Sequence, residues 1–458
     1  MKETGMQNNK PNGRNTAGVS KRGRVPVGSM ILGEGMYYSK DGIKTHVNNN
    51  VCVIGTSGCG KTRGYVSPNL MMAEGSYVIS DPKGNLADKY GPYLESLGYK
   101  VIRMDFIHPK KSFRYNPITR CRTTQDIMRL AHMLVYELRG NTSATGRSYD
   151  PFWDEATLIL LMSLIGYMVE ATYMPDAEKN MSKLAEMIAD AFSQDGNRGM
   201  HSLAKTTRNM NQHLEWMNAH GKESWAYKRY KEFSCAPEKT HNTITICSLA
   251  KLSTYDSQEV RHMLSGNDLD FCTIGQERTA LFVQVSDTDR TMDALVNLFY
   301  SQIMNELCDY ADTKCEGSRL PVPVQFILDD FATNARIDNF ENIISNIRSR
   351  GISTMIMLQS EAQLRAAYGD SAATIVDNCN TYVYLGGSSP EQAKSVAQRA
   401  NKPSSQILNM PLDKGWIFRR GEQPILCDVF DLNLFETELG FKYGQPAHSI
   451  PEDLDAIG

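Results

Sequence analysis

Residues 51–62 read VCVIGTSGCGKT, an apolar run that leads directly into a glycine-rich segment. Gly55, four intervening residues and then Gly60-Lys61-Thr62 match the pattern G-x-x-x-x-G-K-[ST] of a phosphate-binding loop. In such a loop, the backbone N–H groups and the positive end of the following helix face a phosphate chain. The pattern predicts that Lys61 reaches the β and γ phosphates of ATP and that the Thr62 hydroxyl is a ligand of Mg²⁺. The residues expected to bind the nucleotide are Gly55, Thr56, Ser57, Gly58, Cys59, Gly60, Lys61 and Thr62.

A second apolar run, residues 324–328 (VQFIL), ends in the acidic pair Asp329-Asp330. In phosphate-loop enzymes such a strand is expected beside the loop strand, and its first acid holds the hydration shell of Mg²⁺. We expect Asp329 to take that role as a second metal-site residue, next to Lys61. Asp330 is the candidate general base for the attacking water, although its side chain is one methylene shorter than the glutamate commonly found there. A pair that only caps the strand end is the alternative interpretation.

Further polar residues are candidates for the same site. Gln359 ends the apolar run TMIMLQ, where an amide would hydrogen-bond both water and the γ phosphate; a purely structural glutamine is equally compatible. Arg348 or Arg350, in IRSRG, would neutralise transition-state charge if a neighbouring subunit of a ring supplied it; otherwise both are solvated helix charges. Asp81 and Lys83, in DPKG, are expected first to form a turn and only second to contact phosphates.

Alternating apolar runs and helical stretches predict the fold class. Nearly continuous apolar strands with helices between them are typical of an α/β protein whose parallel sheet is covered on both faces. A nucleotide then binds at the carboxyl ends of the strands, where the glycine-rich loop already lies. Periodic helical segments replace the strands from about residue 122 to 271, which predicts an all-helical insertion. Strands are expected at 51–54, 76–80, 101–104, 279–285, 324–328, 354–358, 382–385 and 416–418.

Composition limits the function classes. A net charge of −3 over 458 residues argues against a protein coated in basic residues, but allows a channel lined by a few of them. The 10 cysteines show no metal-ligand spacing, which is typical of a reduced compartment without a zinc site. The apolar stretch 156–174 contains Glu170 and is flanked by acids, so we expect a buried helix rather than a membrane-spanning one.

The expected organisation has five parts. They are a disordered basic tail at 1–26, a nucleotide-binding domain in two parts at 27–149 and 237–440, an all-α insertion at 150–236, and a C-terminal tail at 441–458.

Aromatic and basic side chains are interleaved within and near the insertion. Stacking faces beside cations are what single-stranded DNA requires. An amphipathic helix with a buried aromatic stripe explains the same residues, so both interpretations stay open. The residues concerned are Trp216, Trp225, Tyr227, Tyr230, Phe233, Lys222, Lys228, Arg229 and Lys231.

Six segments carry a likeness to a known family: GTSGCGKTRGYVSPNL, SYVISDPKGNL, YNPI, PFWDEA, the GIS that follows Arg350, and LQSEAQLRAAYGD. From about residue 31 to 430 the chain resembles the TraG-type coupling proteins of conjugative type IV secretion systems, in a form similar to those of Gram-positive mobile elements. The resemblance implies a RecA-like motor domain with an all-helical insertion, which acts as a hexameric ATPase at the cytoplasmic mouth of the secretion channel. It also implies that the protein receives a relaxase bound to single-stranded DNA and helps to pump the DNA out. The family's functional positions fall on Lys61, Asp329, Asp330, Gln359 and Arg348.

Two departures from the family pattern bear on function. The family usually has an Asp-Glu pair where this chain has Asp329-Asp330, which concerns the rate of hydrolysis. It also usually has two N-terminal membrane helices, and none precede the motor here. We expect either that a separate anchor protein supplies them or that this chain is a soluble form, so that attachment at the cytoplasmic face of the membrane is peripheral. The alternative functions are an ATP-binding substrate receptor with little or no hydrolysis and a translocase of double-stranded DNA.

Overall fold

The computed structural model describes residues 25–136, 151–190, 204–286, 288–331, 337 and 339–445. The expected basic tail therefore lies outside the described residues except for its last two. The expected C-terminal tail lies outside them from residue 446 onward.

The chain divides into two compact units, which we call the sheet unit and the helical unit. The sheet unit comprises residues 1–103, 271–287 and 304–458, and the helical unit comprises residues 104–270 and 288–303. The segment 150–236, expected to be an all-helical insertion, lies within the helical unit. Its bounds as a domain stay a prediction.

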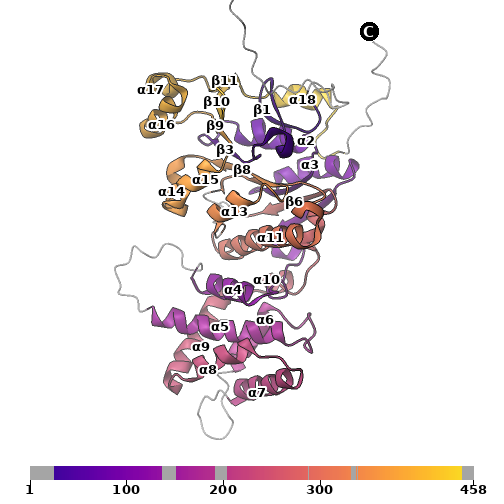
Figure 1. The fold of residues 1–458 in the computed structure, drawn as a ribbon, viewed down its shortest axis with the longest axis vertical. Helices are drawn as coiled ribbons and strands as arrows, with labels where there is room; N and C mark the ends of the chain where they lie inside the picture. Colours follow the sequence, from indigo (N-terminus) through magenta and orange to yellow (C-terminus); the bar gives the residue numbers. More distant parts are fainter. Residues whose placement is uncertain are drawn as a thin grey trace, which may run out of the picture. The chain divides into compact units, whose positions relative to one another are not determined.

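A nine-stranded sheet forms the centre of the sheet unit (Figure 1). Each of the eight apolar runs in the sequence overlaps one of its strands, and β11 is the additional one. The strands are β3 (Val51–Ile54), β4 (Ser76–Ser80), β5 (Lys100–Asp105), β6 (Thr279–Gln284), β7 (Val324–Leu328), β8 (Ile352–Leu358), β9 (Thr381–Tyr384), β10 (Lys414–Arg419) and β11 (Ile425–Asp428). Their order across the sheet is β11-β10-β9-β3-β8-β7-β4-β6-β5.

The strands around the phosphate-binding loop are parallel, as expected. β3 pairs in parallel with β8 and β9, β7 pairs with β8 and β4, and β4 pairs with β6. At one edge, however, β10 is antiparallel to both β9 and β11, so the expectation of a parallel sheet is wrong there. Residues 420–424 join β10 to β11 through a turn in which Gly421 has φ +81°. So short a connection joins only antiparallel neighbours, because a parallel crossover needs about a dozen residues.

The acidic strand β7 does not lie beside the loop strand β3, which corrects a second expectation. β8 lies between them, and Ile54 of β3 pairs with Leu358 of β8 while Leu328 of β7 pairs with Ile356. Long crossover connections allow a later strand to enter between two earlier ones, so chain order alone does not determine which strands are neighbours.

A short antiparallel hairpin precedes the sheet and was not predicted. It consists of β1 (Ser29–Gly33) and β2 (Met36–Ser39), and all residues of β1 are buried. The Asn69 side chain accepts from Ile31 N at 3.0 Å and donates to Ile31 O at 2.9 Å. Because Asn69 is on α2 (Ser67–Met71), these two bonds fasten the hairpin to the helix that follows the phosphate-binding loop.

The remaining helices divide between the units. Those of the sheet unit are α1 (Gly42–Thr45), α3 (Asn85–Ser96), α13 (Phe340–Asn346), α14 (Glu361–Tyr368), α15 (Ser371–Asp377), α16 (Pro390–Ala400), α17 (Ser404–Leu408) and α18 (Leu432–Glu438). Those of the helical unit are α4 (Thr124–Tyr136), α5 (Phe152–Glu170), α6 (Met181–Asp190), α7 (Ala204–Ala219), α8 (Trp225–Ser234), α9 (Glu238–Leu252) and α10 (Gln258–Met263). The helix α11 (Asp293–Lys314) contributes residues to both units.

α5 is the central helix of the helical unit. It packs against α4, α8 and α9, which surround it in Figure 1. Within the described residues, α5 is the one helix long and apolar enough to cross a membrane by length and composition alone. However, 61% of that segment is buried inside the protein, and Leu160, Leu164 and Met168 are fully covered. This burial agrees with the expectation of a core helix.

Candidate functional site

The phosphate-binding loop begins in the middle of the sheet, at the carboxyl end of β3. Gly55 N donates to Leu358 O of β8 at 3.0 Å, and Leu385 N donates to Ile54 O at 2.8 Å. The start of the loop is therefore held from both sides. After Lys61 the chain enters a π-helical turn, Thr62–Val66, which continues into α2. π-helical turns are uncommon and occur often at functional sites.

The loop glycines are required for two different physical reasons. Gly58 and Gly60 have φ of +79° and +89°, which side chains rarely tolerate. Gly55 has an ordinary φ but no space around it. A Cβ there would lie 2.5 Å from Cys59 Sγ and 2.9 Å from Leu385 Cβ. The curl that turns the backbone N–H groups inward therefore depends on glycine at each of these positions.

Lys61 lies inside this curl. Its Nζ donates to Gly55 O at 2.7 Å and to Thr56 O at 3.1 Å, and its side chain is largely buried. An ammonium held at this point places a positive charge at the centre of the loop, as expected for a group that contacts phosphate oxygens.

Thr62 and Asp329 are in direct contact although their strands are not neighbours. The Thr62 hydroxyl donates to Asp329 Oδ2 at 2.7 Å. This contact forms because Thr62 lies in the first turn after the loop, beyond the end of β3, and Asp329 lies immediately beyond β7. The sequence predicts both residues at one metal site, and the structure brings them together across the intervening strand β8 rather than from adjacent strands.

The electrostatics of this pair suit a divalent cation. Burial raises the pKa of Asp329 above its ordinary value; the Thr62 hydrogen bond and Lys61 lower it in part, and the charge of Asp330 raises it. A buried carboxylate whose charged form is disfavoured is stabilised by a nearby cation. A hydroxyl and a carboxylate oxygen are also the hard ligands that Mg²⁺ takes from proteins. The residues present therefore fit Mg²⁺, held by Thr62 and Asp329.

Asp330 adopts a conformation that its sequence did not reveal. Its φ is +49°, in the left-handed region, and its N–H donates to Asp329 Oδ1 at 3.1 Å. Among residues other than glycine, Asp and Asn are enriched severalfold in this region. The backbone at this position therefore favours aspartate over the glutamate common in the family.

Gln359 follows β8 and so lies between the phosphate-binding loop and the acidic pair. Leu358, the residue before it, accepts the hydrogen bond of Gly55 N. The Gln359 side chain is half-buried, and its Oε1 accepts from Gln363 Nε2 at 3.4 Å. This strand-end position is the one predicted from the sequence for a residue that senses the γ phosphate.

The two candidate arginines do not join this group within the chain. Arg348 precedes β8, at the strand end opposite the loop, and its Nη2 donates to Gly42 O at 3.1 Å. Arg350 forms an ion pair with Asp312, with Nη2 to Oδ2 at 2.6 Å. Neither lies beside the loop of the same chain, so a catalytic role for Arg348 requires a second copy of the protein.

The other sequence candidates are explained largely by packing. The Asp81 carboxylate accepts from Ala87 N at 2.9 Å, and Lys83 is exposed, as expected for a turn that leads into α3. In the helical unit, Tyr230 and Phe233 are buried, and the Trp225 ring lies against Gly166 of α5. This part of the aromatic stripe therefore supports the amphipathic-helix interpretation.

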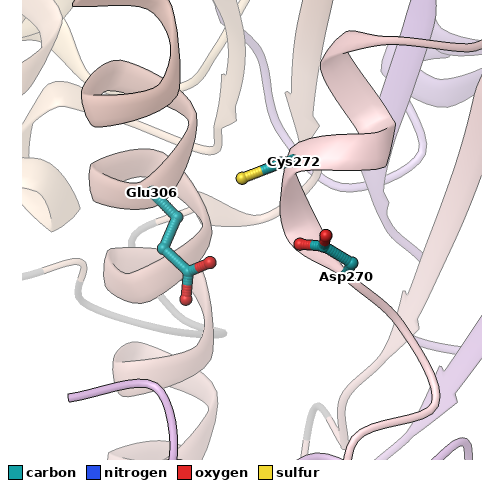
Figure 2. Close-up of side chains that lie close together, drawn as sticks. All are labelled: Asp270, Cys272 and Glu306. Atoms are coloured by element: carbon teal, nitrogen blue, oxygen red, sulfur yellow. The ribbon is translucent and has the colours of Figure 1, made fainter. Parts of the chain in front are cut away.

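A thiol and a carboxylate lie close together elsewhere in the sheet unit. Figure 2 shows Cys272, in the short helix Phe271–Gly275, and Glu306, on α11. Their ligand atoms lie within 4.8 Å of each other and both residues are buried. The third labelled residue, Asp270, belongs to the helical unit. Two ligands are fewer than the four of a structural zinc site, so we assign no metal to this pair.

Comparison with known sequences identifies relatives. Residues 6–403 match the family described as type IV secretory system conjugative DNA transfer. Protein VirD4 of Rhizobium rhizogenes is 21% identical over 377 residues, which cover 80% of this chain and 51% of that protein. Protein VirD4 of Agrobacterium fabrum is 21% identical over 357 residues, which cover 76% and 48%. The chain therefore spans about half the length of these curated relatives.

Comparison with solved structures confirms the fold. The plasmid coupling protein TrwB in complex with ADP and Mg²⁺ has a TM-score of 0.61 at 15% identity, over 88% of this chain and 89% of that one. VirB4 of Thermoanaerobacter pseudethanolicus has a TM-score of 0.51 at 14% identity, over 89% and 98%. At such low identity the likeness shows the fold alone, which is a RecA-like phosphate-loop fold with a helical insertion.

Proposed function

The chain belongs to the type IV secretory system conjugative DNA transfer family, and from this membership we propose that it is an ATP-hydrolysing coupling protein. In this proposal it recruits relaxase-bound single-stranded DNA to a type IV secretion channel and drives the transfer of that DNA. One observation carries the proposal. The 2.7 Å contact between Thr62 Oγ1 and Asp329 Oδ2 lies directly after the loop that holds Lys61.

Each residue of the site has a defined task in ATP hydrolysis. Lys61 and the backbone N–H groups of the loop bind the phosphate oxygens, and Thr62 and Asp329 hold Mg²⁺, which neutralises charge on those oxygens when bound. Asp330 accepts a proton from the attacking water, and Gln359 orients that water. Positioning and electrostatic stabilisation account for most of the rate enhancement in phosphoryl transfer.

The proposed assembly is a homo-hexameric ring. Arg348 lies at the strand end opposite the phosphate-binding loop, where it is exposed and available to a neighbouring copy. An arginine supplied in this way is worth about 10³–10⁵ in rate in other phosphoryl-transfer systems. The ring would act at the cytoplasmic face of the membrane and contact the relaxase, the channel components and a separate membrane anchor.

The test is ATP turnover by the purified chain with single-stranded DNA present. Lys61→Ala removes the loop charge and is expected to lower turnover by on the order of 10²–10³-fold. Lys402→Ala is the matched control, because it removes an exposed lysine that follows α16. If Lys61→Ala hydrolysed ATP as fast as the parent chain, the proposed function would be wrong. Stimulation by double-stranded but not single-stranded DNA would indicate the alternative translocase.

One observation favours a second candidate function, an ATP-binding receptor with little turnover. Asp330 has a short side chain on a left-handed backbone, so its carboxylate has limited reach toward a γ phosphate. A displacement of about 1 Å costs on the order of 10²-fold in rate. This candidate predicts tight ATP binding, negligible turnover and no gain from Asp330→Glu. A large rise in turnover from that substitution would exclude it.

A further inference from the structure

A cavity of about 320 Å³ lies at the amino-terminal edge of the strands, within the sheet unit. Val324 and Ile352, the first residues of β7 and β8, line it. The phosphate-binding loop follows the opposite, carboxyl end of the neighbouring strand β3. β8 has seven residues, so about 20 Å of strand separates the two ends. The cavity is therefore distinct from the nucleotide site of the same chain.

Positive charge dominates the lining of this cavity. The residues that line it include four cations and one carboxylate, namely Lys40, Arg278, Arg319, Arg348 and Glu74. The Arg319 side chain lies over Gly351, where φ is +79° and a Cβ would meet Arg319 Cγ at 3.4 Å. Glu74 also accepts from Gly28 N at 3.0 Å. The excess of cations in a concave site favours an anionic occupant.

Two side chains at the cavity supply donors that are costly to bury. Lys40 Nζ donates to Gln325 Oε1 at 3.1 Å, and burial lowers the pKa of Lys40 to about 8 despite the opposing charge of Glu74. Gln325 is only 4% exposed. Since a lysine ammonium only donates hydrogen bonds, the amide oxygen of Gln325 must face it, which fixes the amide orientation.

The consequence of that orientation is an unsatisfied donor. Gln325 Nε2 has no hydrogen-bond partner among the residues that the structure describes. A buried donor without a partner costs free energy, and natural structures contain few of them. Nε2 has almost no solvent-accessible surface, so a ligand in the cavity would contact Lys40, which Gln325 holds in place, and would offset the cost of burying that ammonium.

We propose that this cavity binds a phosphate-bearing ligand through Lys40 and Arg319, with Gln325 positioning Lys40. Deprotonated phosphoryl oxygens only accept hydrogen bonds, and an arginine side chain donates to two of them in a bidentate geometry. Four cations against one carboxylate leave a positive excess that matches a doubly or triply charged anion. Apolar residues such as Val47, Val322 and Pro323 also line the cavity, so an organic phosphate fits better than a bare ion.

This proposal does not require that the chain hydrolyses ATP. The two proposals share Arg348, which lines the cavity and is also the proposed trans arginine, so the test leaves Arg348 unchanged. Free phosphorylated compounds and the phosphates of single-stranded DNA offer the same chemistry. The experiment therefore includes both.

The experiment is calorimetric titration of the full chain with inorganic pyrophosphate in EDTA. The parent chain is expected to show two sites, one at the phosphate-binding loop and one at the cavity. Lys61→Ala should remove the first and Arg319→Gln should weaken the second at least about tenfold. The double variant should show neither. Arg365→Gln, an exposed arginine on α14, is the matched control and should keep both sites.

A second cavity variant, which keeps the shape of the side chain it replaces, distinguishes loss of the site from loss of folding. Gln325→Glu has nearly the same shape, and its carboxylate would pair with Lys40 and neutralise that charge, so it should also weaken the second site strongly. Competition by AMP would identify a free organic phosphate as the source, and competition only by a single-stranded oligonucleotide would identify DNA. A single pyrophosphate site in the parent chain, a second site unaffected by both cavity variants, or equal competition by citrate would overturn the proposal.

Discussion

The left-handed conformation of Asp330 leads to a quantitative prediction about two substitutions. Asp330→Asn keeps the shape of the side chain and its tolerance for φ +49°, and removes only the charge. Asp330→Glu restores the residue common in the family but places a longer side chain on a backbone that disfavours it. The two substitutions therefore separate the chemical role of the residue from its conformational role.

The magnitudes follow from the backbone. A threefold to fivefold enrichment of aspartate over other residues at positive φ corresponds to about 0.6–1 kcal/mol. Asp330→Glu is therefore expected to reduce the stability of the sheet unit by about 1 kcal/mol, or roughly 2–4 °C in Tm. Asp330→Asn should leave Tm unchanged and lower ATP turnover by on the order of 10²–10⁴-fold, because a general base is lost.

The assays are thermal unfolding followed by fluorescence and steady-state ATP turnover with single-stranded DNA. ATP binding, measured by titration, should be retained in both variants. An Asp330→Glu chain as stable as the parent would refute the conformational argument. An Asp330→Asn chain with full turnover would refute the assignment of Asp330 as the base.

Three further predictions follow from individual contacts. Gly55→Ala should abolish ATP binding and lower Tm, because the new Cβ would lie 2.5 Å from Cys59 Sγ; nucleotide titration and thermal unfolding test this, and an unchanged affinity would contradict it. Glu170→Gln should destabilise the helical unit by about 1–3 kcal/mol in urea unfolding at pH 7, because Glu170 Oε2 accepts from Ser224 Oγ at 2.6 Å and lies 3.0 Å from a nitrogen of the buried His213. Burial raises the pKa of Glu170, but these partners lower it by more, so the net pKa lies below the ordinary 4.5. The stabilisation is therefore present above pH 4.5 and is lost as pH falls through the folded pKa. Equal unfolding of variant and parent at pH 7 would contradict this. Burial lowers the pKa of Lys40 from 10.5 to about 8, so the parent should gain stability relative to Lys40→Met as pH rises from 8 to 10, and a gap in Tm that does not change with pH would contradict this.

The sequence predicted the parts of the site that depend on local pattern. The spacing of the glycines predicted a phosphate-binding loop with Lys61 and Thr62, and the apolar run before Asp329 predicted a strand with an acidic end. Each of these two signals spans only a few consecutive residues. Gln359 was located in the same way, from an apolar run that ends in a polar residue. The fold class followed from the alternation of strands and helices.

The remaining features depend on contacts between distant residues. No local pattern shows that β8 lies between β3 and β7, since strand order depends on how crossover connections pack. The hairpin of β1 and β2 depends on Asn69, more than thirty positions later in the chain. The φ of Asp330 and the orphaned amide of Gln325 are properties of the folded backbone and of three-dimensional neighbours. The antiparallel pairing of β10 with β11 could have been predicted from the short connection that contains Gly421.

The position of β8 restricts how the two ends of the sheet unit communicate. The strand is hydrogen-bonded to β3 on one side and to β7 on the other, so sliding along its axis would break two ladders at once. Ile352, the first residue of β8, and Gln359, which follows its last residue, are therefore expected to move together with the sheet as one rigid body. A conformational change that passes from the loop to Arg348 would involve a tilt of the whole sheet or a movement of the segments that connect the strands.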